Sequence, residues 1–185
     1  YAADKAKIIE NIDARFQAHQ DIALKIYDYA ELGYLENKSS ALLKNTLRDA
    51  GFRLEEGVAN IPTAFIAEAG EGKPVIALLA EFDALPGITQ SADPFRNEIP
   101  AKASGHACGH HLFGTASLGA AIAIKEWLEK NNVKGTVRLY GTPAEEGGSG
   151  KVYMVREGLF KDVDTVLSWH PGSENVATVK PSLAN

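Results

Sequence analysis

A short apolar run, Val75-Ile76-Ala77-Leu78-Leu79-Ala80, constrains the fold of this chain more than any other feature. It follows a turn at residues 70–74, and its side chains are apolar at both odd and even positions. Both faces of a strand are apolar when helices cover both sides of its sheet. The run therefore predicts a strand in the interior of a sheet that is covered by helices.

Predicted helices and strands alternate along the rest of the chain. Apolar residues recur at near-helical spacing over residues 4–30 and 38–50, and Gly33 and Gly51 follow these two segments. A third, more buried helix is expected over residues 112–131, and a short one over 151–157, after a flexible bend at 147–150. Further strands are expected at 52–57, 63–69, 136–141, 164–169 (buried) and 176–180. This alternation predicts a layered α/β domain with a mainly parallel sheet.

Composition narrows the class of protein. The 185 residues fit one domain, 1–185, with 45% hydrophobic and 23% charged residues, as is ordinary for a soluble protein. The net charge of −5 offers no basic surface, so we expect neither nucleic acid nor a membrane as a partner. The single cysteine cannot form an internal disulfide. We expect a cytoplasmic protein, with a secreted or periplasmic location left open.

The stretch Ser104-Gly105-His106-Ala107-Cys108-Gly109-His110-His111 holds the single cysteine and three of the five histidines. Thiolate and imidazole groups are ligands for zinc and other transition metals. Cys108 and His110 can reach one metal from a turn-like backbone, which the neighbouring glycines favour. The alternative is a small buried cysteine beside histidines that stabilise a turn.

Two later stretches supply the groups that such a metal site lacks. Glu145 and Glu146 follow a predicted strand, and two adjacent carboxylates are costly unless a cation lies beside them. One could bind the metal while the other takes a proton from water, although a solvated pair on a loop is common. His170 ends another predicted strand, where a lone histidine is more often structural, but beside the other clusters it is the expected fourth protein ligand. Asp83 could bind or support the metal, or cap the turn at 85–87.

These groups are expected to lie together. Glu81 and Asp83, then Glu145 and Glu146, then His170 each follow a predicted strand of the sheet. Ligands of open α/β sheets bind beyond the carboxyl ends of the strands. The topology therefore places the three clusters at one edge of the sheet.

Four ordered motifs resemble those of the aminoacylase/carboxypeptidase-type metallopeptidase family, and most closely its amidohydrolase branch, including the aminobenzoyl-glutamate hydrolase subunits. The motifs are Ala80-Glu81-Phe82-Asp83-Ala84-Leu85-Pro86, Gly105-His106-Ala107-Cys108-Gly109-His110, Thr142-Pro143-Ala144-Glu145-Glu146-Gly147-Gly148 and Trp169-His170-Pro171. The resemblance implies a three-layer α/β/α, zinc-exopeptidase-like catalytic domain with a mixed, mainly parallel sheet.

The resemblance also implies roles for individual residues. Cys108, His110, Glu146 and His170 match the family's ligands for two divalent metal ions, zinc or manganese, with cobalt and nickel as further candidates. Glu145 matches the general base that activates water to cleave the amide bond of an N-acyl amino acid or dipeptide-like substrate. Asp83 and His111 are expected to support the ligands, and His111 replaces an aspartate that is common in the branch.

Family members are longer than this chain and carry a lid and dimerisation domain. The chain is therefore expected to be the N-terminal portion of a catalytic domain, whose full-length form is a homodimer or a hetero-oligomer. Two alternatives stay open. One is a non-catalytic α/β domain with a vestigial or structural metal site, and the other is a hydrolase that uses Cys108 as its nucleophile, which requires a lowered thiol pKa.

Overall fold

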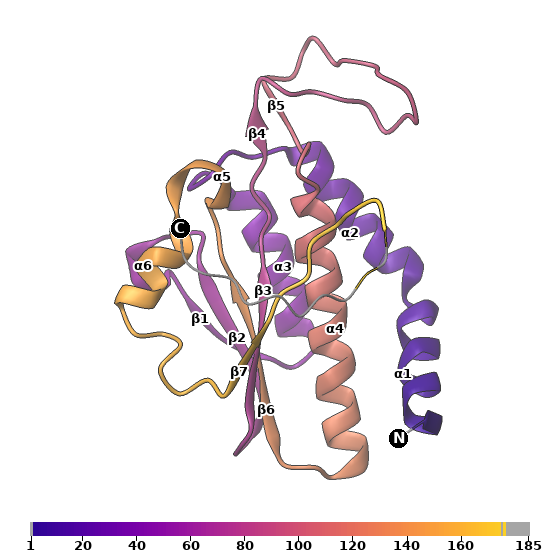
Figure 1. The fold of residues 1–185 in the computed structure, drawn as a ribbon, viewed down its shortest axis with the longest axis vertical. Coiled ribbons are helices and arrows are strands. Elements are labelled where there is room, and N and C mark those ends of the chain that lie inside the picture. Colours follow the sequence, from indigo (N-terminus) through magenta and orange to yellow (C-terminus); the bar gives the residue numbers. More distant parts are fainter. Residues whose placement is uncertain (1, 175, 177–185) are drawn as a thin grey trace.

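β3 (Val75–Ala80) lies inside a five-stranded sheet, as its two apolar faces predict. The structure is a computed structural model, and it describes residues 2–174 and residue 176. The strand order is β1-β2-β6-β3-β7, and a small second sheet joins β4 and β5 beyond the main one (Figure 1). The other strands are β1 (Arg53–Glu56), β2 (Phe65–Glu71), β4 (Leu85–Pro86), β5 (Ser104–Gly105), β6 (Gly135–Gly141) and β7 (Thr165–Leu167).

The main sheet is mixed. In the described part of the chain, β3 pairs in parallel with β6 and with β7, whereas β2 pairs antiparallel with β1 and with β6. The register sets Leu78 opposite both Leu139 and Leu167. Because β3, β6 and β7 run in the same direction, their carboxyl ends meet at one edge of the sheet.

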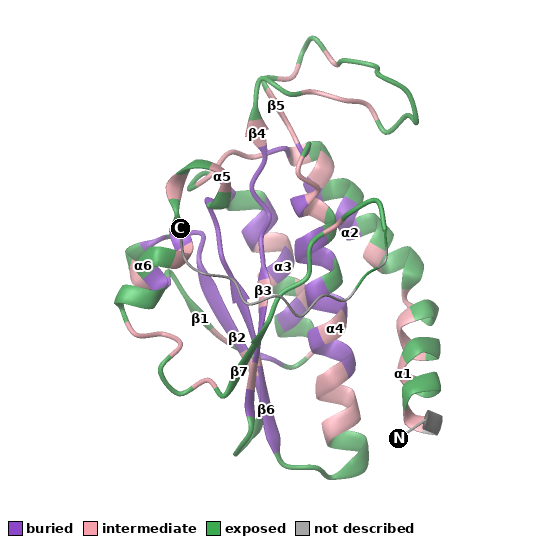
Figure 2. Cartoon of the chain, viewed as in Figure 1, coloured by how far each residue is buried: buried purple, intermediate pink, exposed green. Residues whose placement is uncertain are grey.

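The longer helices cover one face of this sheet. The helices of the described residues are α1 (Ala2–Ala14), α2 (Phe16–Tyr29), α3 (Asn37–Asp49), α4 (His110–Asn131), α5 (Glu145–Gly148), α6 (Gly150–Arg156) and the 3₁₀ turn η1 (Val58–Asn60). From α2, α3 and α4, Ile26, Leu43 and Leu118 are fully buried and pack in one core cluster with Phe82 and Leu139. Figure 2 shows this buried interior between the sheet and the helices.

A second, smaller core lies on the opposite face. It joins Val58 of η1, Ile66 of β2, Tyr140 of β6 and Met154 of α6. Phe160 stacks on Tyr140, with ring centroids 4.3 Å apart. Apolar side chains thus pack on both faces of the sheet, which confirms the predicted α/β class and its three layers.

The prediction of a single helix over residues 4–30 is wrong, because α1 and α2 are separate helices. The break falls at Arg15, whose φ of −102° and ψ of 7° are not helical. The Arg15 guanidinium donates two hydrogen bonds, of 2.9 and 2.6 Å, to the Glu126 carboxylate of α4. Apolar periodicity carries no sign of this contact, because its partners are 111 positions apart.

Three other expectations need correction. The strand expected to be buried at 164–169 is β7, which is shorter and exposed, with 45% of Val166 and 50% of Leu167 accessible. The reason is that β7 pairs on one side alone in the described part of the chain. The third helix begins at His110 rather than 112, and the expected bend at 147–150 overlaps the helical turn α5. The strand expected at 176–180 lies outside the described residues, apart from residue 176.

Candidate metal centre

The predicted site residues converge at the carboxyl edge of the sheet. Glu81 and Asp83 follow β3, Glu145 and Glu146 form the first turn of α5 after β6, and His170 follows β7. Cys108 lies just before α4, in the loop that crosses this edge. The structure thus brings together Cys108, His110, His170 and the acidic residues, as the topology predicted.

His110 is the first residue of α4 and is fully buried. Gly109 precedes it with a φ of 81°, and a Cβ there would lie 2.7 Å from Cγ of Pro171, so the bend into the helix requires glycine. His110 Nδ1 lies 2.9 Å from Oδ1 of Asp83 and 3.1 Å from the Asp83 carbonyl oxygen. Both neighbours are acceptors, so Nδ1 carries a proton and Nε2 is the nitrogen left to bind a metal.

Nε2 of His110 faces a group of carboxylates. Its distances are 2.9 Å to Oε2 of Glu81, 3.8 Å to Oε2 of Glu145 and 4.0 Å to Oε1 of Glu146. Five buried side-chain atoms of the described residues have no hydrogen-bond partner, and two of them, His110 Nε2 and Glu146 Oε1, lie here, with Nε2 at ion-pair distance from Glu81. Buried polar atoms are rarely left so. A divalent cation bound at Nε2 in place of a proton would lie among these carboxylates and satisfy both atoms.

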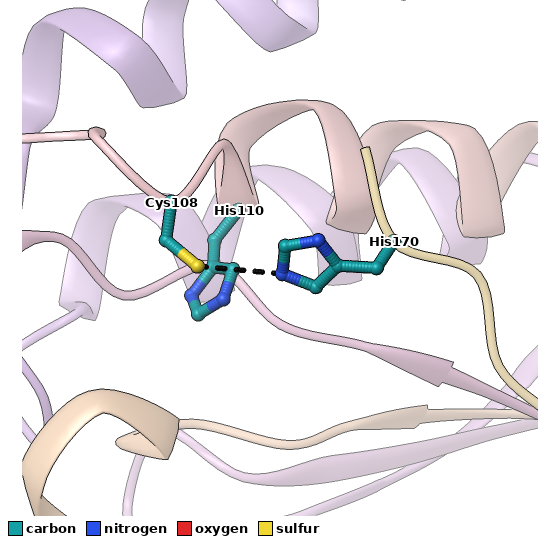
Figure 3. A group of neighbouring side chains, drawn as sticks. All are labelled: Cys108, His110 and His170. Atoms are coloured by element: carbon teal, nitrogen blue, oxygen red, sulfur yellow. Dashed lines mark hydrogen bonds between the residues drawn. The ribbon is translucent and has the colours of Figure 1, made fainter. Parts of the chain in front are cut away.

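The Cys108 and His170 side chains point toward one another beside the His110 ring (Figure 3). Cys108 Sγ lies 3.3 Å from Nε2 of His170, and one ligand atom from each of Cys108, His110 and His170 lies within 4.8 Å of the others. His170 Nδ1 lies 3.0 Å from the Pro171 carbonyl oxygen, so here too the proton belongs on Nδ1 and Nε2 is free to bind a metal. Glu81, His110 and Glu145 form a second such group. Sulfur, imidazole and carboxylate donors at this spacing fit one or two divalent transition-metal ions.

The electrostatics of the site favour positive charge. Burial disfavours the charged form of His110, but the Asp83 and Glu81 carboxylates outweigh burial and raise its pKa to about 10. Burial, together with Glu146, Glu145 and Glu81, raises the pKa of the Cys108 thiol to about 11. A cysteine nucleophile needs a lowered pKa, so the surroundings of Cys108 argue against the cysteine-hydrolase alternative.

Asp83 and His111 were both predicted to support the metal ligands, and the structure places them differently. Asp83 holds His110 through Nδ1, the arrangement expected of a residue that orients a metal ligand. The His111 ring instead packs edge-on against Tyr27 of α2, with centroids 4.9 Å apart, and lies 5.2 Å from the His106 ring. Burial lowers the pKa of His111 to about 4, with a smaller contribution from His110.

Sequence reasoning placed Glu81 at this edge but gave it no role, and it missed Lys151. Glu81 is 7% exposed; one of its carboxylate oxygens lies beside His110, and the other accepts a hydrogen bond from Lys151 of α6. Burial raises the pKa of Glu81, but His110 and Lys151 outweigh it, and the net shift is downward. The acidic pair at positions 81 and 83, directly after a buried strand, was the signal for Glu81. No local pattern marks Lys151.

The fold is that of a family of metallopeptidases. A family model described as peptidase family M20/M25/M40 matches residues 77–183, and the chain belongs to this family. The resemblance read from the motifs is thereby confirmed.

Two curated relatives show how similar this chain is to individual members of the family. The chain is 52% identical over 165 residues to a p-aminobenzoyl-glutamate hydrolase subunit of Escherichia coli (strain K12), a match that covers 89% of this chain and 34% of that protein. It is 34% identical over 147 residues to N-acetyl-L-cysteine deacetylase of Bacillus subtilis (strain 168), a match that covers 78% of this chain and 34% of that one. The chain thus spans about a third of the length of these curated relatives.

A solved structure shows the same fold. The chain superposes on a dinuclear metal-binding peptidase of family M20 from Bacillus subtilis with a TM-score of 0.75 and 26% sequence identity. The match covers 86% of this chain and 44% of that structure. None of the described helices is both long and apolar enough to cross a bilayer.

Proposed function

We propose that this chain carries the metal-binding part of an amidohydrolase that cleaves the amide bond of an N-acyl amino acid. The observation that carries the proposal is that ligand atoms of Cys108, His110 and His170 lie within 4.8 Å of one another at the carboxyl edge of the sheet, with the buried Oε1 of Glu146 4.0 Å from His110 Nε2. The names of the relatives support the reaction class, since both describe hydrolysis of an N-acyl amino acid. The first of them makes an aminobenzoyl-glutamate-like compound the leading candidate substrate.

Four residues would hold the metal ions. Cys108, His110, Glu146 and His170 present sulfur, nitrogen and oxygen atoms to one space, and Asp83 orients His110. The donor set suits two divalent cations, zinc or manganese, with cobalt and nickel as further candidates. A bound divalent cation would polarise the amide carbonyl group and make a water molecule more acidic.

Glu145 is the general base of this proposal. Its side chain is 42% exposed, whereas that of Glu146 is 19% exposed and turns one oxygen into the buried site. The more exposed carboxylate can reach both solvent and a substrate. Oε2 of Glu145 would take a proton from the attacking water and pass it to the departing amine nitrogen.

The proposed partners are small molecules and other protein chains. The relative from Escherichia coli is named as a subunit, which supports a hetero-oligomer, and a homodimer is the alternative. Neither arrangement requires nucleic acid or a membrane.

The first test measures metal content and hydrolysis together. Elemental analysis after dialysis would be made on the wild type and on Cys108→Ala, Glu146→Ala and Glu145→Gln, with Glu55→Gln on exposed β1 as a matched control. We expect Cys108→Ala and Glu146→Ala to lose metal. Glu145→Gln should keep its metal and lose about 10²- to 10⁴-fold in the hydrolysis rate of aminobenzoyl-glutamate or another N-acyl amino acid.

Each part of the proposal can fail separately. Full metal content in both Cys108→Ala and Glu146→Ala would overturn the ligand assignment. An unchanged rate in Glu145→Gln would overturn its role as base. Metal that the wild type holds tightly, without hydrolysis of any N-acyl amino acid, would favour the non-catalytic α/β domain with a structural metal site.

A further inference from the structure

The connection between α2 and α3, residues 31–36, packs against the turn that carries Glu145 and Glu146. It is anchored to the segment after β3, because the Ala84 amide donates a 2.8 Å hydrogen bond to the Glu31 carbonyl oxygen and Leu32 forms a parallel bridge with Ala84. From this anchored position it reaches Ala144, which lies 108 positions beyond Glu36 in the sequence.

Glu36 makes the central contact. The residue is fully buried, and its carboxylate oxygens accept hydrogen bonds from the Ala144 amide, at 2.8 Å, and from the Thr63 hydroxyl, at 3.0 Å. A buried carboxylate is costly. Burial and, to a smaller extent, the Asp83 carboxylate raise the pKa of Glu36. The hydrogen bonds to Glu36 lower it, but the net shift is upward. A carboxylate at this buried position therefore needs a role that offsets the cost of its burial.

Ala144 is the point at which the chain turns from β6 into α5. It is fully buried and has a left-handed backbone, with a φ of 57° and a ψ of 44°. This conformation is strained for a non-glycine residue, and it persists where surrounding contacts impose it. The Glu36 carboxylate is the acceptor for the Ala144 amide, and without it that amide would be a buried donor with no partner. The backbone angles of Ala144 set the direction in which Glu145 and Glu146 leave the strand.

Two neighbours of Glu36 contact the same turn. A Cβ at Gly33 would lie 2.9 Å from both Cα and Cβ of Ala144, so the two backbones approach as closely as glycine permits. The Tyr34 hydroxyl donates a hydrogen bond to the carbonyl oxygen of Gly148 at the end of α5. The connection therefore holds both ends of the turn that bears the acidic pair.

We infer that Glu36 is a positioning residue, whose carboxylate fixes the left-handed turn at Ala144 and thereby aims Glu145 and Glu146 at the metal centre. The inference rests on the proposed function, in which these glutamates are base and ligand. Glu36 acts through the Ala144 amide.

The test compares Glu36→Ala, Glu36→Gln and Thr63→Val in the full chain. Glutamine keeps an acceptor for the Ala144 amide, and valine removes the hydroxyl group from the other carboxylate oxygen alone. Since a misplacement of about 1 Å can cost ~10²-fold in rate, we expect Glu36→Ala to lower kcat by about 10- to 100-fold with little change in KM. Glu36→Gln and Thr63→Val should stay close to the wild-type kcat. A kcat for Glu36→Ala equal to that of Thr63→Val would overturn the inference.

A second readout separates this inference from the proposed function. Hydrogen exchange of residues 142–150 should be faster in Glu36→Ala than in Glu36→Gln, while exchange in β1 and β2 stays the same. This comparison decides the inference even if the wild type hydrolyses no N-acyl amino acid. Equal exchange of residues 142–150 in the two variants would overturn it. If Glu36→Ala does not fold, Gly33→Ala takes its place, because its methyl group presses on Ala144; unaltered exchange and kcat there would likewise refute the role of the connection.

Discussion

His110 and Tyr140 are both fully buried polar residues, and they differ in how far the fold satisfies them. The Tyr140 hydroxyl donates a 2.7 Å hydrogen bond to the Leu159 carbonyl oxygen, and its ring packs in the smaller core. His110 is hydrogen-bonded at Nδ1 to Asp83, whereas its Nε2 faces three carboxylates at 2.9 to 4.0 Å. A buried group of the first kind stabilises a fold, whereas a buried imidazole among several carboxylates indicates a site for a cation.

Tyr140→Phe tests the structural role. The substitution leaves the Leu159 carbonyl oxygen without this donor, so the free energy of unfolding should fall by about 1 kcal/mol. Urea denaturation followed by circular dichroism measures the change. Tyr153→Phe on α6, where the residue is 45% exposed, is the matched control and should leave stability unchanged. Equal effects of the two substitutions would contradict this prediction.

At the scale of elements, α1 is attached to the domain by polar contacts with α4. Arg15 and Asn11 both donate hydrogen bonds to the Glu126 carboxylate, and α1 is largely exposed (Figure 2). The side chains of Arg15 and Glu126 are about a third exposed, so solvent weakens their ion pair. The attachment of α1 should therefore be weak compared with that of the buried helices.

Glu126→Gln should loosen α1 without unfolding the domain. Loss of an ion pair worth up to about 1 kcal/mol predicts amide exchange in residues 2–14 that is faster by up to about fivefold. Glu129→Gln is a control on the same helix, since Glu129 pairs with Lys125 within α4. The measurement is hydrogen exchange by mass spectrometry, and a change that spreads through α2 and α4 would show that the contact stabilises the whole domain.

At the scale of the whole molecule, Arg138 links the sheet to the segment after α6. It donates two hydrogen bonds of 2.8 Å to the Asp162 carboxylate and another to Glu68 on the neighbouring strand β2. Burial raises the pKa of Glu68, but Arg138 and Arg53 outweigh it and hold the pKa below its ordinary value of 4.5. A depressed acid pKa adds stability above the unfolded value, and that stability is lost as the pH falls.

The Arg138→Met variant should show this pH dependence. At pH 7 it should be less stable than the wild type by about 1 kcal/mol, since the network is partly exposed. The difference should shrink as the pH falls through 4.5 towards the folded pKa of Glu68, where the carboxylates become protonated. Urea denaturation at a series of pH values measures it. Arg156→Met, which removes a cation that lies over the Tyr153 ring, should show no such trend. A difference that grows with acidity would show that another group controls it.

Much of the fold and the candidate site could be predicted from the sequence. The two apolar faces of Val75–Ala80 predicted a central strand, and the acidic and histidine residues that follow β3, β6 and β7 predicted a shared edge. These predictions succeed because strand periodicity is local and parallel strands end on the same side. The motifs around Cys108, Glu145 and His170 pointed to the family for the same reason, since each is a short continuous stretch.

The tertiary structure alone decided the features that depend on distant partners. Arg15 ends a helix where it meets Glu126, the His111 ring turns to Tyr27 rather than to the ligands, and Glu36 lies beneath Ala144. Each contact joins residues whose neighbours in the chain carry no sign of it, because which side chain fills a space depends on how separate elements pack. The sequence by itself determined the main strands, their order and the chemistry at the strand ends, whereas packing decided where the first helix breaks and how those groups are held.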